Sequence, residues 1–364
     1  MNRQSGIDTE KGNSCSRVAF TWAKKSFSNR LGRPGTPSHD LDGSFANILS
    51  FGDLSVGISS DGIGTKIECA ERIKRYDSLG FDLLAMVLDD LVTIGLEPVG
   101  ISNILDVDFL DESVVDHLMH GLHDAAREAR VIITGGEIAE LGSRIGGYGT
   151  GMHFNWCATA FGVLPPGRKP LDGRCIQPGD RLIALRSAGF RSNGFSKIRM
   201  ILESAYGPEW HDTMYDDVKT WGTILLTPSR IYARAVSDLL ERNVPISGIA
   251  HITGGGIADN LKRVLAPLSV GAVLDALVEP HDCMLKLQQL GSVPEEEAYR
   301  LWNMGCGMLL TTPSREVSAV IQFLGERGII AREAGSIQAK PQIEITTSGA
   351  DPTRIIVPVK PRLK

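Results

Sequence analysis

The sequence predicts an α/β (α+β) fold in two domains, each with strands and helices in mixed order. A chain of 364 residues exceeds what one hydrophobic core usually serves, so two domains of roughly 150 to 200 residues are expected. In both halves, short apolar runs of strand length alternate with segments of helical periodicity. The richest cluster of breaking residues, the Pro-Pro-Gly-Arg-Lys-Pro run at 165–170, marks the start of the domain boundary.

The N-terminal domain is expected at residues 51–168, preceded by an arm or lid at residues 1–50. The first 50 residues show little periodicity apart from a short helical pattern at 20–27. Within the domain we expect a mixed sheet with strands at 54–59, 99–105, 131–133 and 156–164 and helices at 81–94 and 111–130. The second helix has acids in its first turn and arginines near its end, as the helix dipole favours.

The C-terminal domain is expected at residues 178–346, with the same mixture of elements. Strands are predicted at 181–185, 246–251, 271–274, 307–311 and 329–334. Helices are predicted at 194–204, 228–241, 282–290, 295–303 and 315–327, with a short one after the glycines at 254–256.

Composition excludes several classes of protein. The net charge of −5 provides no basic surface for nucleic acid, and no apolar run approaches the ~20 residues of a membrane helix. The six cysteines form no CxxC pair and the first residues are polar, so we expect a cytoplasmic protein without a structural zinc site. The 40 glycines exceed the usual share of ~7% and indicate many tight turns or backbone-lined ligand sites.

The segment Asp61-Gly62-Ile63-Gly64-Thr65-Lys66 follows a predicted strand and is a candidate nucleotide site. Its spacing is not that of a P-loop, which needs four residues between its first glycine and Gly-Lys. Gly62 and Gly64 still let backbone N–H groups approach phosphate oxygens, Lys66 supplies a positive charge, and Asp61 offers an oxygen ligand for Mg²⁺. The alternative is a plain turn between strand and helix.

Asp89 and Asp90 lie inside an otherwise apolar helical segment. Two adjacent carboxylates are costly to bury unless they are paired or bound to metal, so at least one should face a ligand. Adjacent helical residues point about 100° apart, and we favour Asp90 as the metal ligand. The alternative places both on a solvated face.

The segment Thr134-Gly135-Gly136-Glu137 also follows a predicted strand, so Glu137 is expected to project from a strand end. Glu140 shares that direction if a helical turn follows. Together with Asp61 and Asp90, these acids can hold one or two Mg²⁺ ions that bridge phosphates, as phosphoryl transfer requires. The alternative is a structural turn with solvated acids.

Two further segments run from a predicted strand through glycines into a helix. Ser192, Asn193 and Gly194 come at a helix N-terminus whose free N–H groups suit an anion, here a substrate phosphate, or else merely cap the helix. His251 precedes Ile-Thr-Gly-Gly-Gly and can act in proton transfer near neutral pH, although a structural role for such a histidine is the alternative.

The order and context of these segments resemble one family, the phosphoribosylformylglycinamidine cyclo-ligases, or AIR synthetases. The resemblance spans roughly residues 53 to 340 and rests on SSDGIGTK (59–66), FDLLAMVLDDLVTIGLEPV (81–99), ITGGEIAEL (133–141), GDRLIALRSAGFRSNGFS (179–196), TPSRIY (227–232), HITGGGIADNLKRVL (251–265) and NMGCGM (303–308).

The resemblance implies ATP- and Mg²⁺-dependent closure of formylglycinamidine ribonucleotide to aminoimidazole ribonucleotide, with release of ADP and phosphate. It also implies homodimers that pair N-terminal domains with nucleotide along the seam. By the same resemblance, three groups of residues have roles: metal ligands Asp61, Asp90 and Glu137; nucleotide contacts Thr65, Lys66 and the glycines Gly62, Gly64, Gly135 and Gly136; and phosphate contacts Ser192 to Gly194. We include Lys66, Glu140 and His251 as candidate catalytic residues.

Departures from the family pattern leave alternatives open. The family usually has His where this chain has Arg191, Asn where it has Asp89, and a glycine-rich segment in place of residues 42–47. The loop beyond Glu140 also differs. The alternatives are a divergent member that phosphorylates a different small substrate, and a catalytically weakened nucleotide-binding dimer.

Overall fold

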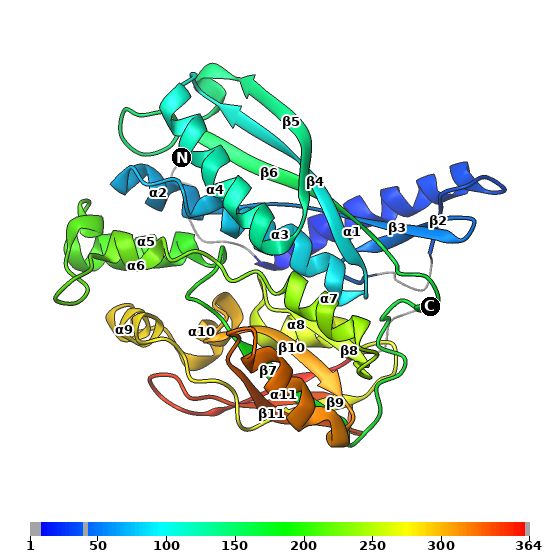
Figure 1. The fold of residues 1–364 in the computed structure, drawn as a ribbon. Coiled ribbons are helices and arrows are strands. Elements are labelled where there is room, and N and C mark those ends of the chain that lie inside the picture. The colour runs from blue at the N-terminus through cyan, green and yellow to red at the C-terminus, as the bar shows by residue number, and fades with distance from the viewer. Residues whose placement is uncertain (1–8, 39–42, 361–364) are drawn as a thin grey trace.

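The computed structural model describes residues 9–38 and 43–360. Two β-sheets, one from each half of the chain, form the framework, and helices lie between and around them (Figure 1). This arrangement confirms the predicted mixture of strands and helices in two halves. Across the described part of the chain, we find no helix whose length and apolar content suit a membrane span.

The first sheet has six strands in the order β1-β2-β3-β6-β4-β5, and all neighbours are antiparallel except β4 and β5. Its strands are β1 (Thr36–Pro37), β2 (Asn47–Phe51), β3 (Leu54–Gly62), β4 (Glu97–Val107), β5 (Ile132–Glu140) and β6 (Phe154–Val163). The helices of this half are α1 (Thr9–Ser26), α2 (Ile67–Ile73), α3 (Leu79–Thr93) and α4 (Glu112–Ala129).

Helix α3 covers one face of the first sheet and also contacts α7 and β8 of the second half. Because it is enclosed on nearly all sides, its apolar residues are buried all round rather than along one stripe. Asp82 and Asp89 on this helix are fully buried, so each needs polar partners. The other face of the sheet is open, and apolar side chains such as Ile58 and Ile104 are exposed there.

The second sheet has seven strands in the order β13-β12-β9-β11-β7-β10-β8, with β12 and β9 as its parallel pair. The strands are β7 (Arg181–Arg186), β8 (Gly248–His251), β9 (Gly271–Leu274), β10 (Cys306–Thr312), β11 (Ala331–Gln338), β12 (Gln342–Thr346) and β13 (Arg354–Pro358). The helices are α5 (Phe195–Tyr206), α6 (Trp221–Leu225), α7 (Ala233–Glu241), α8 (Gly256–Leu265), α9 (Asp282–Leu290), α10 (Glu295–Leu301) and α11 (Val317–Gly325).

The region expected to be an arm contributes strands to the first sheet. β2 begins at Asn47 and pairs with β3, so the last residues of the 1–50 range belong to the sheet rather than to a separate arm. The expected short helix at 20–27 is part of the longer α1, which ends at Ser26. Residues 1–8 and 39–42, which the arm and part of the altered 42–47 segment include, lie outside the described residues.

Candidate active site

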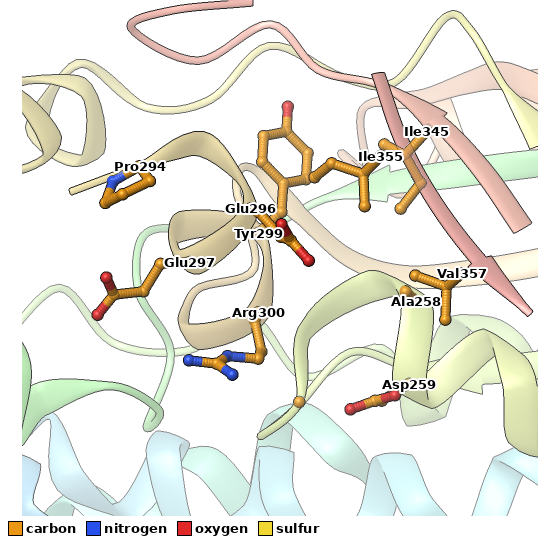
Figure 2. Close-up of a pocket in the computed structure, with 11 residues that line it drawn as sticks. Ala258, Asp259, Pro294, Glu296, Glu297, Tyr299, Arg300, Ile345, Ile355 and Val357 are labelled. Atoms are coloured by element: carbon orange, nitrogen blue, oxygen red, sulfur yellow. The ribbon is translucent and has the colours of Figure 1, made fainter. Parts of the chain in front are cut away.

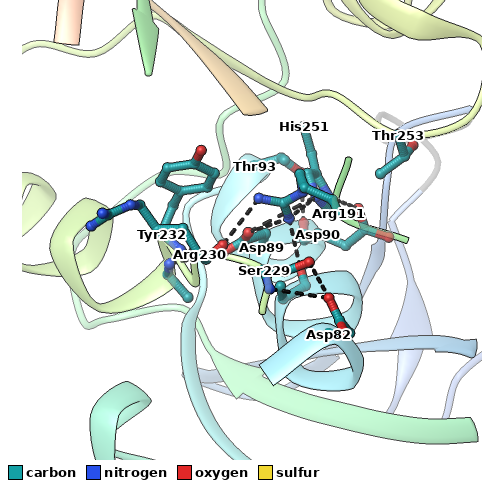
Figure 3. A network of polar contacts seen from close by, with 12 residues as sticks. Asp82, Asp89, Asp90, Thr93, Arg191, Ser229, Arg230, Tyr232, His251 and Thr253 are labelled. Carbon is teal, nitrogen blue, oxygen red and sulfur yellow. Dashed lines mark hydrogen bonds and ion pairs between the residues drawn. The ribbon is translucent and has the colours of Figure 1, made fainter. Parts of the chain in front are cut away.

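The candidate site lies where the last turn of α3 meets the end of strand β8. Nδ1 of His251 lies 2.8 Å from Oδ1 of Asp90, and Nη2 of Arg191 lies 2.9 Å from Oδ2 of Asp89 (Figure 3). The two adjacent aspartates of α3 therefore meet partners from two different elements of the second half. Asp90 is the partly exposed one, in line with the preference stated from the sequence, and its role as a metal ligand stays a prediction.

Asp61 and Asp90 form a pair of carboxylates with perturbed acidity. Desolvation raises the pKa of Asp61 to about 6, and the charge of Asp90 adds to this shift. Burial likewise raises the pKa of Asp90 to about 7. Ser59, two residues before Asp61 on the same strand face, lies 3.3 Å from Asp90 Oδ2. Two neighbouring carboxylates whose surroundings disfavour their negative charge form a suitable site for a cation.

Asp89 connects the two halves of the chain. Its Oδ1 accepts hydrogen bonds of 2.9 Å from the backbone N–H groups of Tyr232 and Ala233, at the start of α7. Its Oδ2 accepts from Arg191. Burial acts to lower the pKa of Arg191, but the opposing effects, of which the charge of Asp89 is the largest, raise it overall, so the guanidinium stays protonated. The buried charge of Asp89 is therefore paired and fully hydrogen-bonded.

His251 does not suit proton transfer near neutral pH, which corrects the expectation drawn from its sequence context. The ring is fully buried, and both nitrogens have partners, Asp90 at Nδ1 and Arg191 at Nε2. Burial, followed by the charge of Arg191, lowers the pKa of His251 to about 3. The imidazole is thus neutral throughout the physiological range.

Lys66 is also placed differently from its expected position at a phosphate. Its Nζ is fully buried and lies 2.7 Å from Oδ2 of Asp82 and 2.8 Å from the carbonyl oxygen of Thr227. Ser229 donates to the same Asp82 carboxylate from both its backbone N–H and its hydroxyl. Because an isolated charge on α3 could not be buried, Lys66 is needed there to neutralise Asp82.

The segment around Glu137 is an edge strand rather than a turn. β5 continues through Gly135 and Gly136 to Glu140, paired in parallel with β4, and the expected strand end at residue 133 is wrong. A register shift opposite Ile101 and Ser102 and a positive φ of 140° at Gly135 accommodate the glycines within the strand.

This strand separates the acids that were expected to converge. Glu137 aligns with Ile104 on the open face of the sheet, whereas Asp61 faces the helix-covered side near Asp90. The two lie on strands three spacings apart, or about 14 Å. Glu140 is three residues along an extended strand, so it points to the face opposite Glu137. One chain alone does not bring Glu137 or Glu140 to Asp61.

Three glycine-containing segments meet beside the carboxylates. Thr65 Oγ1 lies 3.2 Å from the hydroxyl of Ser196, in the first turn of α5. Gly194 precedes that helix with a φ of 78° and lies so close to Trp302 that a Cβ would clash. Asn193 Oδ1 lies next to Gly254 in the turn after His251, 3.6 Å from where a Cβ would stand. The 61–66, 191–196 and 253–256 segments therefore share one region.

Three features of this region bear on ligand binding. The Ser192 hydroxyl is buried without a hydrogen-bond partner among the described residues, as expected of a group that serves a ligand. Gly62 donates its backbone N–H to Asp61 Oδ1 at 2.7 Å, so that amide orients the carboxylate. Gly64 has a φ of 70° and open space around its Cα.

Several structurally important residues were not singled out from the sequence. Asp82 lies seven residues before Asp89 on α3, two helical turns apart and on the same side, which is a readable signal. Its partner Ser229 and the backbone groups that bind Asp89 and Arg191 come from the 227–233 segment. Nothing in the local sequence of that segment indicates these contacts.

A separate cavity of about 410 Å³ lies between α8, α10 and the β12–β13 hairpin (Figure 2). Ile345, Ile355 and Val357 form an apolar wall, and Glu296, Glu297 and Arg300 are on the opposite side. Only its rim at Gly255 approaches the segment after His251, and neither Asp61 nor Asp90 lines it. The chemistry-bearing carboxylates, rather than this cavity, define the candidate active site.

The fold and the site define a protein of the AIR synthase related class. The family model for its N-terminal domain matches residues 43–163, and that for its C-terminal domain matches residues 177–348. Among solved structures, thiamine-monophosphate kinase from Stenotrophomonas maltophilia has a similar fold, with a TM-score of 0.60 and 16% identity over 84% of this chain and 90% of that one.

Curated relatives narrow the class to one family. The phosphoribosylformylglycinamidine cyclo-ligase of Thermococcus kodakarensis is 37% identical over 95% of this chain and 98% of its own length. That of Carboxydothermus hydrogenoformans is 38% identical over 80% of this chain and 83% of its own length. The chain belongs to the phosphoribosylformylglycinamidine cyclo-ligase family, which confirms the resemblance read from the sequence.

Proposed function

We propose that this protein catalyses the ATP-dependent ring closure of formylglycinamidine ribonucleotide to aminoimidazole ribonucleotide, with release of ADP and phosphate. Relatives of that name match nearly the whole chain, which supports the activity. The observation that carries the proposal is the pair of carboxylates with raised pKa values, Asp61 and Asp90, beside three glycine-containing segments. Phosphoryl transfer requires such an arrangement, because the reacting phosphates carry a high negative charge that the site must compensate.

The residues at the site fit Mg²⁺ and a polyphosphate. Asp61 and Asp90 offer hard oxygen ligands, and their raised pKa values mean that a cation would relieve an existing electrostatic penalty. The unpartnered hydroxyl of Ser192 and the N-terminus of α5 suit phosphate oxygens. When bound, Mg²⁺ would neutralise phosphate charge and leave the γ-phosphoryl group open to attack.

The steps of the proposed reaction indicate the role of each of these residues. An amide oxygen is a poor leaving group, so it must first accept the γ-phosphoryl group before the neighbouring nitrogen closes the ring. The backbone amides around Ser192 to Gly194 would hold and orient the phosphates, and the carboxylates of Asp61 and Asp90 would hold the metal that fixes the position of the ATP phosphates. Lys66 supports this site only indirectly, by holding the 61–66 segment against α3.

We also propose a homodimer that uses the open face and the free edge of the first sheet. Ile58 and Ile104 on that face, and Ile132, Ile133 and Ile138 on edge strand β5, are exposed. An apolar surface of this kind on a sheet is typical of an interface. In its own chain Glu137 cannot reach Asp61, so we propose that it serves the site of the partner subunit.

The compartment that we propose is the cytoplasm. All six cysteines are unpaired in the structure, as is usual in a reducing environment.

Magnesium affinity is expected to fall as the pH drops below 7. The pKa values of about 6 at Asp61 and about 7 at Asp90 mean that both carboxyls are largely protonated at pH 5.5, and protons compete with the metal. We expect binding about 100-fold weaker at pH 5.5 than at pH 8, measured by isothermal titration calorimetry. Asp90→Asn should make the dependence shallower. An affinity that does not change with pH would rule out these two residues as ligands.

The proposed activity is tested by incubating the purified protein with ATP, Mg²⁺ and formylglycinamidine ribonucleotide and following aminoimidazole ribonucleotide. Stoichiometric product and ADP support the proposal. ATP binding without product would refute it, even if the fold and the dimer are as described.

A further inference from the structure

Arg191 occupies an unusual place for an arginine. Its side chain is 1% exposed, and its backbone has a φ of 59°, which few residues other than glycine adopt. The guanidinium reaches α3, the segment before α7, and strand β8 at once. Nη1 donates to the carbonyl of Arg230 at 3.0 Å, and Nη2 donates to Asp89 Oδ2 at 2.9 Å and to His251 Nε2 at 2.8 Å (Figure 3).

The contact with His251 determines where the imidazole carries its proton. A guanidinium has only donors, so Nε2 facing Arg191 must be the acceptor and carry no hydrogen. The single proton of the neutral ring is then on Nδ1, which lies 2.8 Å from Asp90 Oδ1. His251 therefore donates to Asp90, and the direction of this hydrogen bond is set by Arg191.

Without Arg191, a competing arrangement is available. Nε2 of His251 lies 3.9 Å from Asp89 Oδ2, so a proton on Nε2 would find an acceptor there after a small shift. The lone pair of Nδ1 would then face the Asp90 carboxylate and repel it. Arg191 prevents this by filling the space between Asp89 and His251 with N–H groups.

The consequence is a defined orientation of Asp90. With Nδ1–H of His251 on Oδ1, the hydrogen bond found for the other oxygen, Oδ2, among residues 9–38 and 43–360 is the long 3.3 Å contact from the Ser59 hydroxyl. Oδ2 is thus the oxygen available to a ligand. Partners that orient a ligating side chain in this way affect a site almost as strongly as the ligands themselves.

We propose that Arg191 is a positioning residue, which fixes His251 in its Nδ1–H tautomer and thereby holds Asp90 with Oδ2 directed at the ligand. This inference rests on the proposed function, since it takes Asp90 as a metal ligand. It makes the buried Asp89–Arg191 pair part of the active-site machinery rather than only a link between the two halves.

The test separates positioning from simple charge pairing. Arg191→Gln alone would leave Asp89 buried and unpaired, so it is combined with Asp89→Asn. The amide oxygen of the asparagine can still accept from the backbone of Tyr232 and Ala233, so its NH2 group takes the place of Oδ2. That NH2 group can donate to the glutamine oxygen, which puts an acceptor instead of a donor in front of Nε2 of His251. Exchanging a buried ion pair as a unit is often tolerated, and we expect the double variant to fold with a Tm close to that of the parent. Arg191→Lys, which keeps a positive donor, is the matched control.

Two readouts are needed, and neither requires turnover. The ¹⁵N resonances of the His251 ring, assigned by comparison with His251→Gln, report which nitrogen carries the proton. We expect Nδ1–H in the parent and in Arg191→Lys, and Nε2–H or a mixture in the double variant. Calorimetric titration with Mn²⁺, a probe for the metal, should show affinity about 10- to 100-fold weaker in the double variant only.

Three outcomes overturn the proposal: Nε2–H in the parent protein, Nδ1–H retained in the double variant, or a changed tautomer with Mn²⁺ affinity unaltered. The first needs no variant and so applies even if the double variant does not fold. Failure of the proposed function would be seen separately, as a parent protein that makes no aminoimidazole ribonucleotide while the tautomer still depends on Arg191.

Discussion

Replacing Asp61 or Asp90 with asparagine is expected to lower the rate of aminoimidazole ribonucleotide formation by about 10²- to 10³-fold. Asparagine has the same size but no charge, so it would bind Mg²⁺ less well, and the phosphate charge that the metal would neutralise would be less well compensated. Steady-state kinetics at saturating ATP measure the loss.

The same substitutions should not destabilise the protein at pH 8. Because the pKa of each carboxyl is higher in the folded chain than its ordinary value of 3.8, the folded state loses stability as the pH rises from 3.8 through about 6 for Asp61 and about 7 for Asp90. Asparagine removes that loss, so Tm should stay level or rise. Loss of activity without loss of stability is typical of a functional site.

Asp53→Asn is the matched control, since this exposed aspartate lies in the turn before β3, eight residues from Asp61 along the extended chain, or about 26 Å. It should leave both rate and Tm unchanged. If Asp61→Asn and Asp90→Asn turn over as fast as the parent, the carboxylate pair does not serve catalysis and the proposed site is wrong.

Lys66→Met should lower the free energy of unfolding by about 3–5 kcal/mol, the usual result of breaking one partner of a buried ion pair. Nζ of Lys66 and the carboxylate of Asp82 are both fully buried, so the substitution leaves an uncompensated charge within α3. Urea denaturation at constant pH gives the value.

Two further variants test whether that loss of stability comes from breaking the buried ion pair. Arg75→Met breaks a half-exposed pair with Asp77 and should cost less than about 1 kcal/mol. The double variant Lys66→Met/Asp82→Asn should recover much of the stability lost in Lys66→Met, because both charges are gone. If instead Lys66→Met unfolds like the parent while ATP affinity collapses, Lys66 contacts phosphate, as first expected from the sequence.

The sequence was most informative where the burial of a residue follows from the residues next to it in the chain. The apolar run at 81–94 predicted the helix observed at Leu79–Thr93, and two acids within it predicted that one would face a ligand site. The preference for Asp90 over Asp89 agrees with their exposure, because helical geometry separates adjacent side chains.

Expectations failed where the deciding partner is distant in the chain. Lys66 and Asp82 are 16 residues apart, and Thr227 is 161 residues from Lys66, so local spacing could not show that this lysine is used internally. The glycines at 135 and 136 favoured a turn, but pairing with β4 extends the strand through them. Tertiary pairing overrode the local preference.

The departures from the family pattern at residues 89 and 191 also depend on a contact between residues that are distant in the chain. In the sequence they are two unrelated differences from the family pattern, 102 positions apart. In the structure they are direct partners, so one change compensates the charge of the other. Reading them as signs of a weakened enzyme is unnecessary once this contact is known.

Complementation between two inactive variants tests most directly whether one site draws carboxylates from two subunits. Asp61→Asn and Glu137→Gln are carried on differently tagged copies, and the mixed dimer is purified through both tags. If Glu137 serves the site of the partner subunit, each mixed dimer contains one site with both carboxylates intact. We expect each parent variant to be nearly inactive and the mixed dimer to recover about half of the unmodified activity. A mixed dimer as inactive as its parents, or a fully active Glu137→Gln homodimer, would contradict the shared site.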